Sequence, residues 1–528
     1  MRTKNVLLFL FCCLFSAGSA WAQTNVDLTF SQPIKASKKA KILNSGQVDD
    51  RIYAIQFDKN EYSMLIYDSN LKFLKETPFK KRNCKEGEDC IDKHFGYKTT
   101  LFFKDRILVL FETFETSTKN RLLLCQAFNL NGEFVGKLTL LDNIPAAKKS
   151  NSGSFSVRYS KDRTKFVVIQ STPYDKKADE EFGFKVYDGN LQNISNSKIS
   201  LPYKDKNTWV VSSHLSNKGD VYMLVGVRLE KDSKQKGEDS KFYSLLSLRS
   251  STDNSLSEYK VQLSSKNIVD IAIQIDNENE HISCAGFYSD IKPGSRGRTN
   301  DIDGVFYLNV DVNTQKILSE NYKPFDKEMV AQLLGKREGA KVKETQGIST
   351  SFRIDDFIKL PDGSSYVMAE SFRIVEKRVC NSKGVCTTTY TYHYNNIFAI
   401  GISKEGEVKT LIDVPKRQIS SNNTDYFSYL TMQKDDKVFL LFNDNVKNLQ
   451  KGAATIRETK TMTGVRGGAT LMLVELLPDG RYTKREILSP KSKTTLKVRN
   501  GFRLNEGRYV VPATLTGNMF GFARVDLK

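Results

Sequence analysis

Six of the eight cysteines lie beyond residue 22, and four of these six form two pairs with the same spacing. The pairs are Cys84 with Cys90 and Cys380 with Cys386. A histidine follows each pair, His94 and His393, so metal binding is the alternative to disulfide formation. Neither stretch supplies a clear set of four ligands for zinc. In an oxidising compartment the spacing therefore predicts two short-loop disulfides and no metal site.

Residues 373–396 combine basic and aromatic side chains. The charged residues are Arg373, Lys377, Arg378 and Lys383 against Glu376, a balance of +3. The segment also contains Tyr390, Tyr392 and Tyr394, which a strand would place on one side because successive side chains alternate. We expect a projecting hairpin whose tyrosine stripe either packs on the protein body or contacts a protein or a sugar ring.

Residues 443–469 form a second basic segment. The charged residues are Lys447, Lys451, Arg457, Lys460 and Arg466 against Asp444 and Glu458, again a balance of +3. A solvated flexible loop is the simplest interpretation of this composition. If the two segments are neighbours, they form one basic and aromatic patch. The binding residues predicted for this patch are Arg373, Lys377, Arg378, Tyr390, Tyr392, Tyr394, Arg457, Lys460 and Arg466.

Known catalytic motifs are missing from the sequence. It contains no His-Glu-x-x-His, no Gly-x-Ser-x-Gly and no phosphate-binding loop. We therefore predict no catalytic residue and no cofactor, although carboxylates on separate loops could still assemble into a site. Cys125 and Cys284 lie in apolar segments and are expected to be buried free thiols.

The first 22 residues have the pattern of a secretory signal peptide. Arg2 and Lys4 precede a short apolar run, and Ala20-Trp21-Ala22 fits a cleavage site. Without Arg2 and Lys4 the formal net charge of +19 becomes +17, which favours acidic partners or reflects a lysine-rich soluble surface. We expect an exported protein of the periplasm or cell surface, with no transmembrane segment and no nucleic acid partner.

A four-strand pattern recurs along the chain and predicts the elements that position these segments. Aromatic and β-branched residues are frequent, which indicates an all-β protein. Eight units can be distinguished, at 36–80, 95–141, 153–201, 208–263, 268–323, 350–414, 425–489 and 499–528. A period of this length with four strands in each unit is typical of a β-propeller, here of about eight blades with seven as the alternative.

The last unit shows only three strands, so the blade it forms needs a fourth. Residues 26–30 have the character of such a strand and are not used by the first unit. If this strand pairs with residues 520–525, it closes the ring and removes two exposed sheet edges. The expected organisation is therefore a signal peptide at 1–22 and one closed propeller domain at 23–528.

The repeat resembles that of propellers related to the bacterial envelope protein TolB. Residues 155–168, FSVRYSKDRTKFVV, carry the likeness, and the turns at residues 360–363 and 477–480 show the Pro-Asp-Gly form that residues 161–163 lack. The resemblance implies a secreted repeat protein of the bacterial envelope. It supports a fold and does not fix a function.

The long insertions all fall in connections that open on one face of a propeller. The main ones are at 80–94, 323–349, 373–396 and 443–469. Within 323–349 a helix is expected to begin after Asp326 and to lie across the ring. Because binding residues tend to lie on loops held by a rigid scaffold, this face is the expected functional face.

The expected function is therefore binding without catalysis. The leading hypothesis is a scaffold propeller of the cell envelope that engages a protein partner through its long-loop face. The alternative is a propeller that binds or cleaves carbohydrate. The sequence does not specify the partner or the oligomeric state.

Overall fold

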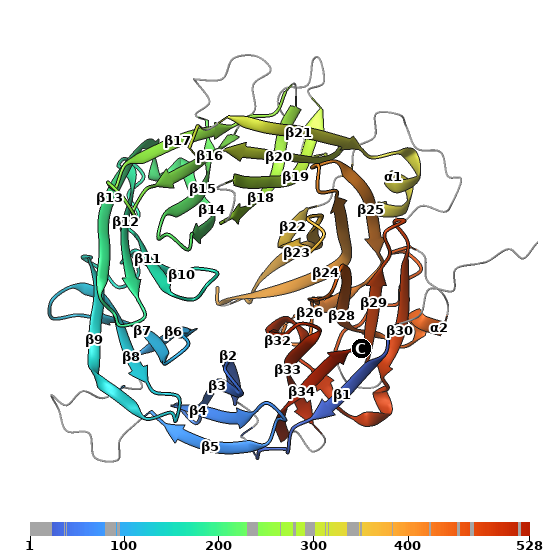
Figure 1. Ribbon diagram of the computed structural model, residues 1–528, viewed down its shortest axis with the longest axis horizontal. Helices are drawn as coiled ribbons and strands as arrows, with labels where there is room; N and C mark the ends of the chain where they lie inside the picture. The colour runs from blue at the N-terminus through green and yellow to red at the C-terminus, as the bar shows by residue number, and fades with distance from the viewer. Residues whose placement is uncertain are drawn as a thin grey trace, which may run out of the picture.

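Eight antiparallel sheets stand around a central opening in the computed structural model, as in a β-propeller (Figure 1). The structure describes residues 24–528 except 36, 38–39, 80–90, 92–94, 230–240, 265, 278–280, 291–300, 312, 315, 335–347, 349–350, 383, 422–423, 451–454, 465–468 and 516–518. In blades one to seven the first of the four main strands lies nearest the centre and the fourth lies on the outside (Figure 1). The prediction of an all-β propeller is confirmed, with eight blades.

Blades one to four are simple meanders of four consecutive strands. Blade one contains β2 (Lys41–Val48), β3 (Arg51–Asp58), β4 (Glu61–Asp68) and β5 (Phe73–Pro78). Blade two contains β6 (Gly96–Phe102), β7 (Ile107–Glu115), β8 (Asn120–Phe128) and β9 (Phe134–Pro145). Blade three contains β10 (Ser154–Tyr159), β11 (Lys165–Ser171), β12 (Asp179–Asp188) and β13 (Asn193–Lys204). Blade four contains β14 (Thr208–Leu215), β15 (Val221–Arg228), β16 (Lys241–Leu248) and β17 (Leu256–Val261).

Blades five to seven follow the same order, and blade six gains a short fifth strand. Blade five contains β18 (Lys266–Asp276), β19 (His281–Asp290), β20 (Gly304–Asp311) and β21 (Ile317–Pro324). Blade six contains β22 (Phe352–Lys359), β23 (Ser365–Cys380), β24 (Cys386–Ile402) and β25 (Val408–Val414), with β26 (Gln418–Ser420) paired to β24. Blade seven contains β27 (Leu430–Lys434), β28 (Lys437–Asn445), β29 (Ala469–Leu476) and β30 (Tyr482–Leu488).

Blade eight is built from both ends of the chain. Its strands are β31 (Thr495–Leu496), β32 (Phe502–Asn505), β33 (Arg508–Leu515), β34 (Met519–Leu527) and, on the outside, β1 (Val26–Phe30). β1 pairs antiparallel with β34, from Val26 opposite Leu527 to Phe30 opposite Ala523. This pairing confirms the predicted closure by the N-terminal strand.

The second and third strands of the blades are apolar on both faces because neighbouring blades cover both faces. At the boundary between blades six and seven, Met368 and Ala399 of one sheet pack in the same cluster as Phe442 and Val474 of the next. All four side chains are fully buried. Burying a side chain of this size typically contributes about 1.5–3 kcal/mol, and the pattern is repeated around the ring.

The helix of the connection after blade five does not lie across the ring. Helix α1 (Lys327–Leu333) begins after Asp326, whose Oδ1 accepts a hydrogen bond from the Met329 amide at 2.7 Å. Val330 and Leu333 pack into the cluster between blades five and six, and α1 lies at the outer rim beside β21 and β25 (Figure 1). The expectation of a helix over the channel was wrong, because this apolar face is satisfied at the blade boundary.

The closure by β1 can be tested with a single substitution. Leu28 packs with the core cluster that contains Val511 and Val525. We predict that Leu28→Asp lowers the free energy of unfolding by about 2–4 kcal/mol, because it places a charge against apolar side chains. Chemical denaturation measures the change, with Asp27→Asn on the exposed side of the same strand as the control. Equal stability of both variants would show that β1 does not latch the ring.

Candidate functional site

The long-loop face carries a two-stranded ribbon that extends from blade six. Strands β23 and β24 pair within the blade from Ser365 to Glu370, pass a register shift, and continue to pair from Phe372 opposite Tyr394 to Cys380 opposite Cys386. The pairing of β22 with β23 ends at Ser371, so the outer half of the ribbon projects beyond the sheet. Seen down the ring, the ribbon reaches over the central opening (Figure 1). We call residues 373–394 the arm.

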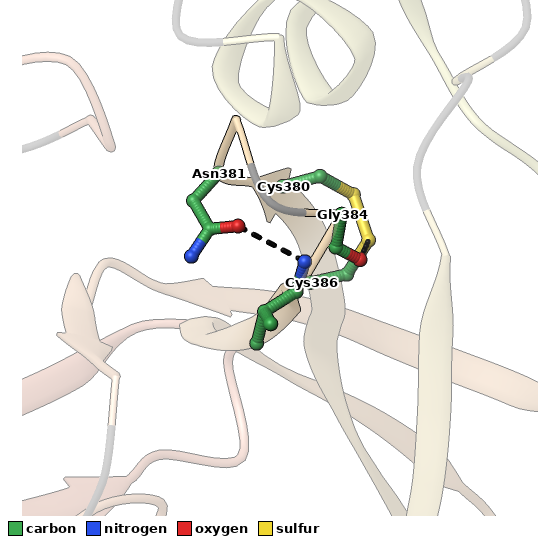
Figure 2. The surroundings of a disulfide bond; sticks show 5 residues. Cys380, Asn381, Gly384 and Cys386 are labelled. Atoms are coloured by element: carbon green, nitrogen blue, oxygen red, sulfur yellow. Dashed lines mark hydrogen bonds between the residues drawn. A yellow bond between two sulfur atoms is a disulfide. The ribbon is translucent and has the colours of Figure 1, made fainter.

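A disulfide closes the tip of the arm. Cys380 and Cys386 are bonded, and their Cα atoms are 3.9 Å apart. Inside the closed turn, the Asn381 Oδ1 atom accepts a hydrogen bond from the Val385 amide at 3.0 Å (Figure 2). This predicted disulfide is confirmed, whereas Cys84 and Cys90 lie outside the described residues.

The two other cysteines beyond residue 22 are buried free thiols. Cys125 and Cys284 lie inside the core clusters, on the third strand of blade two and the second strand of blade five. Burial raises the pKa of the Cys284 thiol to about 12, and it raises that of Cys125 as well. Neither thiol can act as a nucleophile at neutral pH.

The base of the arm is attached to the loop of blade seven. β26 pairs with the three residues of β24 from Tyr392 to Tyr394. Met462, from the loop at 443–469, accepts a hydrogen bond at its carbonyl from the Ile419 amide at 2.9 Å. Tyr394, Phe427 and Met462 form a small apolar cluster beneath the arm. The two basic segments are therefore neighbours at their bases.

A buried ion pair holds the same region. The Lys416 Nζ atom donates to Glu370 Oε1 at 2.6 Å and to Gln418 Oε1 at 3.1 Å, and both members of the ion pair are fully buried. The Ser428 hydroxyl and Arg353 also donate to Glu370, at 2.8 and 3.1 Å. Removing one member of such a pair typically costs about 3–5 kcal/mol, so the network fixes the point from which the arm projects.

The register of the arm divides the predicted patch between two sides. Residues directly opposite each other in an antiparallel pair point to the same side. Tyr390 is opposite Glu376, whereas Arg373 is opposite His393 and Lys377 is opposite Thr389. Arg373 and Lys377 therefore lie on the side away from the tyrosines. The interpretation of the arm as one basic and aromatic surface is corrected by this register.

The three tyrosines differ in exposure along the arm. Tyr394 is buried at the base, Tyr392 is half-buried and Tyr390 is 44% exposed. On the other side, burial lowers the pKa of His393, and the neighbouring Arg373 and Arg417 lower it further. Of the three tyrosines, Tyr390 is the one with an exposed ring. Among the described basic residues of the arm, Arg378 lies on the same side of the ribbon as Tyr390.

The arm exposes apolar side chains that sequence reasoning missed. Ile374, Val375, Val379 and Val385 are between 40% (Val375) and 63% (Val385) exposed. Between Val375 and Val379 the pairing of β23 is with β24 alone, so its outer edge is open. The available signal was the β-branched residues of the arm, among them Ile374, Val375 and Val379 and the threonines of residues 387–391, because such residues favour strands.

The loop of blade seven is anchored at its start and exposed further on. Buried Asp444 accepts from Lys484 at 2.6 Å and from Asn448 at 2.8 Å, and Asn448 lies in the short helix α2 (Lys447–Gln450). Of the predicted binding residues, Arg457 and Lys460 are exposed, and Arg466 lies outside the described residues.

The described ranges hold no metal cluster and no spanning helix. His, Cys, Asp and Glu side chains nowhere gather in groups of three that could hold a metal ion in this part of the chain. Within the same residues, no helix is both long and apolar enough to cross a membrane.

Solved structures similar to this chain are β-propellers. The WD40 domain of SCAP from fission yeast is 7% identical, with 96% of this chain and 94% of that chain covered and a TM-score of 0.38. The β-propeller domain of the Trilobed protease from Pyrococcus furiosus is 10% identical, with 72% and 96% covered and a TM-score of 0.33. No family model matches the sequence, and no curated protein is similar to it at a significant level. These likenesses concern the fold alone.

A buried carboxyl beside the arm predicts a pH dependence of stability. Asp413 accepts from Asn396 Nδ2 at 2.7 and 2.8 Å, and burial raises its pKa to about 7. The folded chain therefore keeps a proton that the unfolded chain loses above about pH 4. Asp413 therefore lowers the free energy of unfolding as pH rises from about 4 to 7, by up to about 4 kcal/mol in total. Above that range it causes no further change.

Asp413→Asn should remove this contribution. We expect the variant to gain stability relative to wild type between pH 4.5 and 7.5, as measured by urea unfolding at both values. Asp50→Asn, at an exposed turn, is the control and should show no such trend. A constant difference between Asp413→Asn and wild type over this range would mean that Asp413 is ionised in the folded protein.

The disulfide predicts local protection of the arm. A disulfide that closes a short loop makes opening of the arm less favourable by about 2 kcal/mol of free energy. The double variant Cys380→Ser, Cys386→Ser should therefore be cleaved by trypsin at Lys377 and Arg378 roughly tenfold faster or more. The melting temperature should stay close to that of wild type, because the arm lies outside the ring. Unchanged cleavage would show that the pairing of the strands alone holds the tip.

Proposed function

We propose that this chain is an exported binding propeller of the bacterial cell envelope, without enzymatic activity, that engages a protein partner through the arm. The observation that carries the proposal is the open ribbon, with Val375 and Val379 exposed on one side and Ile374 exposed on the other. Single exposed apolar residues are common, but several of them on one open strand usually mark an interaction surface.

The shape of the arm favours an extended partner segment. A strand added to the open edge of β23 would pair with its backbone groups between Val375 and Val379, and the side chains of these two residues would contact the added strand. Arg373 and Lys377 lie on that same side of the ribbon. The proposed partner is therefore a protein with an exposed acidic strand or an acidic disordered segment.

Export is supported by two independent observations. The Cys380–Cys386 disulfide is typical of an oxidising compartment. The pattern of residues 1–22 is that of a secretory signal peptide. The periplasm and the cell surface both fit this proposal.

The test is capture of a partner from an envelope fraction by the purified protein. Arg373→Glu, Lys377→Glu and Arg378→Glu together should reduce capture at least tenfold, because they reverse the charge of the arm. The double variant Val375→Ser, Val379→Ser should reduce it as well at unchanged net charge. The melting temperature should remain near that of wild type for both variants.

Two matched controls locate the effect on the arm. The first control makes the same change of charge on exposed connections of the long-loop face, in and directly after blades one and two. It combines Lys59→Glu, Lys119→Glu and Lys149→Glu. Leu140→Ser removes an exposed apolar side chain from the outer strand of blade two. Equal loss of capture in the controls, or sugar binding that Tyr390→Ala abolishes, would contradict the proposal.

A further inference from the structure

A cavity of about 760 Å³ lies at the mouth of the central channel, on the face opposite the arm. Its rim takes residues from six consecutive blades, and these include Lys161, Asn217, Asn277, Lys359, Gln433 and Arg503. All of them lie at or beside the short turns between the first and second strands of their blades. The volume is within the range of small-ligand sites, about 300–1,000 Å³.

Hydrogen bonds between successive turns hold part of this rim in place. The Asp162 amide donates to Asn217 Oδ1 at 3.1 Å, and the Asn217 amide donates to Asn277 Oδ1 at 2.8 Å. Blades six and seven repeat the contact, since the Asp362 amide donates to Asp436 Oδ1 at 3.2 Å. The rim is therefore formed before any ligand arrives, which lowers the entropic cost of binding.

The acids at the rim are largely satisfied by the protein. Asp162 accepts from the Ser160 hydroxyl at 2.5 Å and from the Thr164 amide at 3.1 Å, and these bonds keep the pKa of Asp162 low. Asp276 is paired with Lys359 at 2.7 Å. Glu506 is a further acid of the lining.

Two cations at the rim are left for a ligand. Lys161 and Arg503 are exposed, and within the described ranges neither has a carboxylate partner. They lie on blades three and eight, on different sides of the channel mouth. Lys404 of blade six, whose Nζ lies 3.8 Å from exposed Glu405, adds a third positive charge.

The wall between the cations carries amide and hydroxyl groups beside a few apolar residues, Ile275, Leu360 and Pro361. The Ser283 hydroxyl lies 2.9 Å from the Tyr307 hydroxyl, and both donate to Asn309 Oδ1, at 2.7 and 2.9 Å. Gln274 and Gln433 add further amides, and the aromatic rings of the lining are those of Tyr307 and His281. These amides and hydroxyls suit a ligand rich in hydroxyl groups.

The geometry points to a binding site for an acidic oligosaccharide, a short sugar chain that carries carboxylate groups. The carboxylates would pair with Lys161, Arg503 and Lys404, and the sugar hydroxyls would bond to the amides of the wall. Because the site lies on the face opposite the arm, it is independent of the protein-binding function proposed above.

Calorimetric titration with three compounds tests the site. A trimer of galacturonic acid should bind, and its methyl ester should bind at least tenfold more weakly because it lacks the negative charges. Tripolyphosphate should bind more weakly than the acid trimer because it has no hydroxyl groups for the wall. Failure of the acid trimer to bind, or equal binding of the trimer and either other compound, would overturn the assignment.

Substitutions separate the site from general attraction to a basic protein. Lys161→Gln and Arg503→Gln should each weaken binding of the acid trimer about tenfold, with the melting temperature unchanged. Lys59→Gln, at an exposed turn of blade one away from the mouth, and the triple charge reversal of the arm should leave it unchanged. Equal effects of the rim and control variants would also overturn the assignment.

Discussion

A ring of twisted sheets is stable only if every sheet has both faces covered, and that requirement governs this molecule. The pairing of β1 with β34 completes the last blade, so that blade eight can cover blades one and seven. Without it, the outer edge of β34 would be open to other chains. Because the inner strands are packed on two sides, their side chains can vary little, and new properties must arise in the connections.

The connections at the two ends of the blades differ in length and therefore in what they can do. At one end, short turns bond to each other from blade to blade and hold a polar cavity at a fixed position. At the other end, β23 and β24 run past their sheet and present side chains well away from the ring. One face thus suits a small ligand in a preformed pocket, and the other suits a macromolecule that a projecting element can reach.

The repeat, the number of blades and the closing strand could be predicted because each depends on local alternation and on turn residues. The disulfide at Cys380 and Cys386 followed from spacing alone. The placement of α1 could not be predicted, because its apolar face is satisfied by a boundary between blades that lies far away in sequence. The division of the arm into two sides, and the buried pair of Lys416 with Glu370, depend on register and on contacts across 46 residues.

The rigidity of the arm is what makes its exposed apolar residues informative. A two-stranded hairpin on its own is marginally stable in water, so an unsupported arm would lose its strands. Here the tip is closed by a disulfide, and the base is held by β26, by the cluster around Tyr394 and by the buried ion pair. Each side chain held in place before binding avoids an ordering cost of about 0.5–1.5 kcal/mol. An element supported at both ends in this way, with apolar residues left in water between them, has the structure expected of a contact surface.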